Sequence, residues 1–255
     1  MTVEPVFPSV APPDAPFLQS GPAGAAGAFL GILMLQSRFP RLPGDIGHAE
    51  SFAVPTRRLV VHGATAPRVV RDAAGLAASG LLTAFIDAAR QLEREGAAAI
   101  TTSCGFLVLF QRQLQEAVRV PLVTSSLLML PGLLQARPQV GLLTISSERL
   151  GPEYLQAAGV PPPRLGDVIV QGVATDGEFA RVILGDLPRM DVAKAASEVV
   201  DAARSLKRRA PGIDTVVLEC TNLPPFASQI EKATGLRTLS LLQCESLLLP
   251  FRAGP

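Results

Sequence analysis

The sequence has no tryptophan, a single tyrosine and only three cysteines among its 255 residues. So few aromatic rings argue against a site built on aromatic stacking, and three cysteines are too few for a disulfide framework. An excess of one charge is also missing, since 23 Lys and Arg face 22 Asp and Glu. Without a basic block, we expect neither nucleic acid nor an acidic membrane surface as a partner.

Long hydrophobic runs are absent as well. The apolar run near the start, 23–35, is shorter than the ~20 residues that span a bilayer. No Lys or Arg precedes Arg38, so the positive region of a secretory signal is missing. Residues 1–26 are rich in proline and predict an irregular leader. These features favour a cytoplasmic protein whose cysteines are thiols.

What is present is an alternation of short apolar segments with longer segments of helical periodicity. This pattern is typical of βα units on parallel sheets and predicts an α/β fold. The expected strands are 29–35, 58–62, 97–101, 122–124, 140–145, 168–170, 216–219 and 237–241. The expected helices are 76–95, 106–118, 190–209, 224–234 and 243–251.

The chain also resembles itself. A shift of 116 residues, the separation of Cys104 and Cys220, superimposes two segments that each read strand, cysteine, turn, helix, strand. The earlier strands pair at an offset of 110, with Gly31 over Gly141. We therefore expect two pseudosymmetric parallel-sheet αβα half-domains, 27–130 with 243–255 and 131–242. The active site would lie in the cleft between them, because ligands of open α/β sheets bind at the carboxyl ends of the strands.

The matched cysteines suggest acid/base chemistry. A thiol between a strand and a helix feels the positive helix end, which lowers its pKa, and the free N–H groups there can hold a carboxylate. Two thiols facing one small anionic substrate could remove a proton from carbon and return one from the other side. The alternative is that both are buried packing residues.

Three motifs resemble the aspartate/glutamate racemase superfamily, which works without pyridoxal phosphate. TTSCGFL at 101–107 and LECTNLPP at 218–225 are similar to its two cysteine motifs. MLQSRFPRLPGDIGH at 34–48 is similar to the amino-terminal signature of a less characterised branch. The resemblance implies a cleft between two α/β domains, no cofactor, often a homodimer, and Cys104 and Cys220 as the two catalytic acid/base residues.

By motif position, the resemblance also implies a set of substrate-binding residues: Thr102, Ser103, Gly105, Thr144, Thr221 and Asn222. Ser37 and Arg38, after the first strand, would lie at the same edge, where Arg38 could bind a carboxylate or form a loop salt bridge with Asp45. Cys244 has no partner motif and is expected to be structural. His48 and His62 have no metal-ligand spacing with the cysteines, so no metal is expected, although a Cys-His hydrolase stays open.

These observations predict a cofactor-independent racemase or epimerase of a small amino acid or related carboxylate. An isomerase or decarboxylase of a small dicarboxylate, similar to maleate isomerase or arylmalonate decarboxylase, is a second possibility. A non-catalytic protein that binds small molecules on the same fold is the third.

Overall fold

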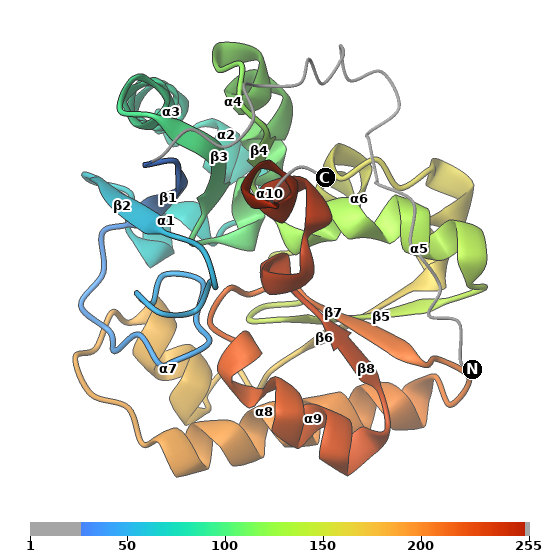
Figure 1. Cartoon of the computed structure of the whole chain (residues 1–255). Helices are drawn as coiled ribbons and strands as arrows, with labels where there is room; N and C mark the ends of the chain where they lie inside the picture. Colours follow the sequence, from blue (N-terminus) through green and yellow to red (C-terminus); the bar gives the residue numbers. More distant parts are fainter. Residues whose placement is uncertain (1–26, 253–255) are drawn as a thin grey trace.

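Two four-stranded parallel sheets with the same strand order form the centre of the fold (Figure 1). The structure, a computed structural model, describes residues 27–252, so the predicted leader lies outside the described residues. The first sheet has the order β2-β1-β3-β4, with β1 (Phe29–Leu35), β2 (Thr56–Val61), β3 (Ala97–Thr102) and β4 (Leu122–Val123). The second has the order β6-β5-β7-β8, with β5 (Val140–Thr144), β6 (Val168–Gly172), β7 (Thr215–Leu218) and β8 (Arg237–Leu239). The predicted pseudosymmetric α/β fold is confirmed.

Helices cover both sheets. They are α1 (Ala66–Val69), α2 (Ala73–Ala77), α3 (Leu82–Arg94), α4 (Gln111–Ala117), α5 (Leu130–Ala136), α6 (Pro152–Ala157), α7 (Glu178–Leu184), α8 (Val192–Arg209), α9 (Ala227–Thr234) and α10 (Glu245–Leu248). In Figure 1, α8 and α9 lie along one face of the second sheet and α5 lies on the other. The carboxyl-terminal α10 packs against β3 and β4 of the first sheet. Along residues 27–252, no helix is both long enough and apolar enough to cross a membrane.

Close packing of one helix on each sheet explains the pairing of Gly31 with Gly141. A Cβ atom on Gly31 would come within 2.9 Å of Leu92 in α3. A Cβ atom on Gly141 would come within 2.9 Å of Leu206 in α8. The two glycines therefore have the same role in equivalent strands: the absence of a side chain lets a helix pack closely on the sheet.

The helices differ most from the sequence prediction. The expected helix at 76–95 is two helices, because Gly80 takes a left-handed conformation (φ +73°) between α2 and α3. The expected helices at 106–118 and 224–234 begin as 3₁₀ turns, η1 (Gly105–Phe110) and η4 (Pro224–Phe226). Four helices, α1, α5, α6 and α7, were not predicted, and each has only four to seven residues. Such short helices carry too few turns to show a helical period.

Candidate functional site

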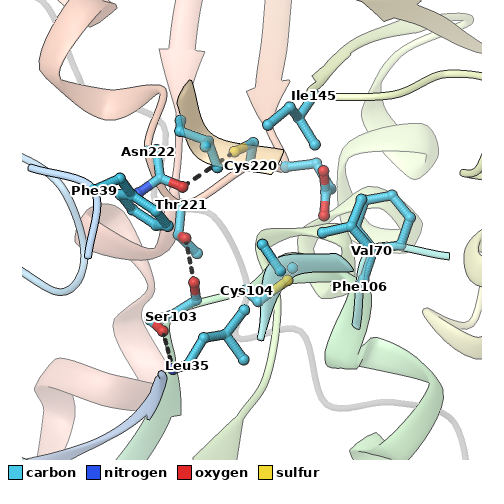
Figure 2. Close-up of a pocket in the computed structure, with 14 residues that line it drawn as sticks. Leu35, Phe39, Val70, Ser103, Cys104, Phe106, Ile145, Cys220, Thr221 and Asn222 are labelled. Atoms are coloured by element: carbon cyan, nitrogen blue, oxygen red, sulfur yellow. Dashed lines mark hydrogen bonds between the residues drawn. The ribbon is translucent and has the colours of Figure 1, made fainter. Parts of the chain in front are cut away.

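The ends of β3 and β7 bring Cys104 and Cys220 to one small buried cavity between the two sheets, which we call the central cavity (Figure 2). Its polar lining consists of Ser103, Cys104, Gly105, Glu219, Cys220, Thr221 and Asn222. Its apolar lining consists of Leu35, Phe39, Ala66, Val70, Phe106, Ile145 and Ile183. The cavity volume is about 20 Å³, which is room for about one water molecule. The two cysteines that the 116-residue self-match pairs are free thiols and line the same cavity.

The two thiols have matched surroundings. The backbone N–H of Phe106 donates toward Cys104, and that of Asn222 donates toward Cys220, which lowers the pKa of each thiol. Burial has the larger and opposite effect, followed by the nearby charge of Glu219. Together they raise the pKa of Cys104 to about 12 and hold the pKa of Cys220 well above its ordinary value.

These shifts correct the expectation of thiolates at helix ends. Each cysteine is followed by a short 3₁₀ turn rather than by a long helix, and the turn after Cys220 begins with Pro224, which has no N–H. The small dipole of such a turn stabilises a thiolate by less free energy than burial of the negative charge costs. Both thiols are therefore protonated in the closed cavity.

Glu219 is the site residue that the sequence analysis missed. The hydroxyl of Thr144 donates to its Oε2 atom at 2.7 Å, whereas its buried Oε1 atom has no hydrogen-bond partner. Burial raises the pKa of this carboxyl to about 7, and the hydrogen bond from Thr144 opposes the shift. The available signal was a carboxylate directly after the apolar strand TVVL and directly before Cys220.

Gly105 is required at its position because Glu219 lies against it. A Cβ atom on Gly105 would be 2.3 Å from Oε1 and 2.4 Å from the carbonyl oxygen of Glu219. Real Cβ atoms do not approach other atoms so closely. The absence of a side chain at Gly105 thus leaves space for the Glu219 carboxylate at the cavity wall.

Three other predicted binding residues line the central cavity and connect its two halves. The hydroxyl of Thr221 donates to the carbonyl of Ser103 at 2.6 Å, and the Ser103 hydroxyl accepts the N–H of Leu35 at 2.9 Å. The Cys220 thiol donates to Oδ1 of Asn222 at 3.6 Å. Of these three bonds, drawn in Figure 2, the one from Thr221 to Ser103 holds the loop after β3 against the loop after β7.

Two predicted binding threonines lie beside the cavity without lining it. The single O–H of Thr102 lies within hydrogen-bond distance of two carbonyl oxygens, of Thr124 at 2.7 Å and of Cys104 at 3.0 Å, so Thr102 braces the cysteine loop. Thr144 is fully buried and donates to Glu219. Both residues act on their neighbours and do not line the cavity.

Ser37 and Arg38 do not line the cavity either. The Arg38 side chain is 72% exposed and pairs with Asp186 at 3.2 Å, so the loop salt bridge expected with Asp45 is formed with Asp186 instead. Arg41 instead pairs with the buried Asp45 carboxylate at 3.0 Å, with 14% of its own side chain exposed, and also donates to the Ser37 hydroxyl at 3.2 Å.

The Arg41–Asp45 pair extends to the second thiol. The amide of Asn222 donates to Asp45, and the carbonyl oxygen of the same side chain accepts from Cys220. The structure therefore connects the loop after β1 to Cys220 through side chains that hold one another in place.

The remaining candidates lie elsewhere. Cys244 packs in a separate apolar cluster with Leu30 and Leu247, consistent with its expected structural role. Neither His48 nor His62 lines the central cavity. Within residues 27–252, no group of three His, Cys, Asp or Glu side chains is arranged to hold a metal ion.

Comparisons with known proteins agree with this geometry. A family model described as Asp/Glu/Hydantoin racemase matches residues 48–244. The structure resembles unliganded arylmalonate decarboxylase, with a TM-score of 0.53 and 18% identity over 89% of this chain and 92% of that one. It also resembles a glutamate racemase isoform from Bacillus anthracis, with a TM-score of 0.55 and 20% identity over 88% of this chain and 81% of that one. At such identities, these two structures show the fold alone.

Two curated relatives are more similar in sequence. A dimethylsulfoniopropionate lyase of Durusdinium sp. clade D is 32% identical over 216 residues, which cover 82% of this chain and 70% of that protein. Dimethylsulfoniopropionate lyase 3 of Emiliania huxleyi is 31% identical over 237 residues, 89% of this chain and 60% of that protein. The present chain therefore spans well short of the full length of both relatives.

These relatives correct the expected activity. Both are lyases, and three further relatives at 28–31% identity carry the same activity in their names. The expectation of a racemase or epimerase, and with it the isomerase class, is wrong. The cysteine motifs identified the right family but the wrong reaction, and the chain belongs to the Asp/Glu/hydantoin racemase family.

Proposed function

We propose that this protein is a lyase that cleaves dimethylsulfoniopropionate by β-elimination. The observation that carries the proposal is the identity of about 30% with dimethylsulfoniopropionate lyases over more than four fifths of the chain. The central cavity supplies a matching chemical apparatus, since two thiols can reach the same small ligand. Removal of a proton beside a carboxylate is a step that racemisation and β-elimination share.

The elimination requires one base and no acid. One thiolate removes the proton on the carbon next to the substrate carboxylate, and that electron pair becomes the new carbon–carbon double bond. The bond between the β carbon and sulfur breaks, and its electron pair leaves on neutral dimethyl sulfide. Acrylate is the second product, and the thiol then releases the proton to water. Because the leaving group departs neutral, no acid is needed to protonate it.

The apolar walls of the central cavity favour this charge change. A negative thiolate and a positive sulfonium react to give a neutral thiol and a neutral sulfide. A site of low dielectric constant destabilises separated charges and therefore assists a step that removes them. The N–H groups of Phe106 and Asn222 that point at the two sulfur atoms stabilise whichever thiolate forms.

The closed cavity must widen before a substrate can enter, since its volume admits about one water molecule. One wall of the cavity is formed by Ala66, Val70 and Ile183, at α1 and α7, and these two helices pack against each other. Neighbouring residues of this wall face an outer hollow of about 370 Å³, lined by Pro67, Arg71, Asp72, Arg149 and Leu184. We therefore place substrate entry between α1 and α7. Amide hydrogen exchange in these two helices should change when a ligand binds, and unchanged exchange would contradict this route.

Dimethyl sulfide release by thiol variants tests the proposal. Purified wild-type protein is incubated with dimethylsulfoniopropionate, and the sulfide is measured in the headspace beside the variants Cys104→Ser and Cys220→Ser. Loss of the base should reduce kcat by about 10²-fold or more. Cys244→Ser is the matched control, because this buried thiol lies outside the central cavity. Wild-type activity in both cavity variants would refute a thiol base, and the variant that loses activity identifies it.

A further inference from the structure

The unpartnered oxygen of Glu219 is the feature of the central cavity that the elimination chemistry leaves unexplained. We propose that Glu219 binds the positively charged group of the substrate, so that the site selects carboxylates bearing a methylated onium group. This inference rests on the proposed function and extends it from a reaction to a substrate class.

The position of the carboxylate supports a ligand role. Among the described residues, two buried side-chain polar atoms have no hydrogen-bond partner, Nε of Arg41 and Oε1 of Glu219. Arg41 already has a buried ion pair with Asp45 and lies over the ring of Phe39. Glu219 has one hydrogen bond, from Thr144, and lines the cavity that holds both thiols. An unpaired buried carboxylate oxygen is costly, so a charge that arrives with the ligand is the natural complement.

The cavity walls favour a methylated cation over an ammonium or a metal ion. Glu219 lines the same cavity as seven apolar residues, and the rings of Phe39 and Phe106 are among them. An ammonium group needs a hydrogen-bond acceptor for each N–H, whereas a methylated onium group has no N–H to satisfy and is bound by aromatic faces and a nearby anion. Metal ions such as Ca²⁺ and Mg²⁺ require several oxygen ligands, and the described residues offer no such group.

A bound cation would also act on the thiols. The charge of Glu219 contributes to the raised pKa of both Cys104 and Cys220. A positive group placed beside Glu219 offsets that negative charge and favours thiolate formation. The same carboxylate would thus select the substrate and couple its arrival to the appearance of the base.

Two non-reacting ligands that differ in charge test the proposal. They are 3-(trimethylammonio)propanoate and its neutral carbon isostere 4,4-dimethylpentanoate, which have the same shape and the same carboxylate. Calorimetric Kd values are measured for wild-type protein, Glu219→Gln and the control Cys244→Ser. We expect wild-type protein and the control to prefer the cation by roughly tenfold or more. The isosteric Glu219→Gln variant should lose that preference.

The outcomes separate this proposal from the proposed function. An unchanged preference for the cation in Glu219→Gln, or no preference in wild-type protein, overturns the role of Glu219 even where dimethyl sulfide is released. A preference that Glu219→Gln abolishes supports the role, even where wild-type protein releases no dimethyl sulfide. If Glu219 were instead the catalytic base, Glu219→Gln would lower kcat while the ratio of the two Kd values stayed at its wild-type value.

Discussion

Replacing Glu219 by glutamine should stabilise the protein, and the gain should depend on pH. Burial raises the pKa of Glu219 from 4.5 to about 7. Between these values the unfolded chain releases a proton that the folded protein retains, so the wild-type free energy of unfolding falls as pH rises. Each pKa unit corresponds to about 1.4 kcal/mol, so the full loss is about 3 kcal/mol. Glutamine has the same shape and does not ionise.

The groups that face Glu219 do not obscure this effect below pH 8. They are the thiols of Cys104 and Cys220 and the hydroxyls of Thr144 and Tyr154. Burial raises the pKa of both thiols and of the tyrosine, so these groups stay neutral in the folded protein over that range.

Urea unfolding between pH 4.5 and pH 8 provides the assay. The free energies of unfolding of wild-type protein and Glu219→Gln should be similar near pH 4.5, and the variant should be more stable by about 3 kcal/mol at pH 8. A difference between the two proteins that does not change with pH would refute the buried, uncompensated carboxylate. The m value should be the same in both, since the exposed surface does not change.

Three further predictions concern neighbouring residues. Gly105→Ala should destabilise the protein by about 1–3 kcal/mol and abolish activity, because the added Cβ atom would overlap Glu219. The control Gly166→Ala, whose Cβ atom would have no neighbour within 4 Å, should leave urea unfolding and dimethyl sulfide release unchanged. Arg41→Ala should cost about 3–5 kcal/mol in urea unfolding because it leaves the buried Asp45 carboxylate without its counter-ion. Arg38→Ala should cost under about 1 kcal/mol because its ion pair is exposed, and equal costs would contradict the assignment. The affinity for 3-(trimethylammonio)propanoate should fall as pH drops through about 7, where Glu219 gains a proton, and calorimetry that finds no change between pH 6 and pH 8 would contradict it.

The strands and the paired thiols could be predicted because both follow from short apolar runs and from the 116-residue self-match. The role of Glu219 could not be predicted, because the sequence pattern of a carboxylate after an apolar strand is the same whether the carboxylate faces solvent or a buried cavity. The direction of the thiol pKa shifts depends on burial depth, which a sequence pattern does not report. Arg38 was expected to pair with Asp45, but Arg41 does so, and this pairing depends on the path of the loop after β1, which the sequence does not report.

The predicted reaction, racemisation, was wrong for a chemical reason. Removal of a proton next to a carboxylate begins both racemisation and β-elimination, and only the group on the next carbon separates them. The two cysteines do not encode that group. The residue that we propose to bind it, Glu219, belongs to the second cysteine motif, but the motif does not report that its carboxylate is buried at the cavity wall. The half-domain boundaries and the homodimer stay predictions.

The most direct test of the central claim is the product balance with dimethylsulfoniopropionate as the sole substrate. Dimethyl sulfide is measured in the headspace and acrylate in solution, with wild-type protein and with a variant in which both Cys104 and Cys220 are serine. Elimination by a thiol base should give equal amounts of the two products from wild-type protein and neither above background from the double variant. Folded wild-type protein that forms no acrylate, or a double variant that forms it at the wild-type rate, would refute elimination by a thiol base.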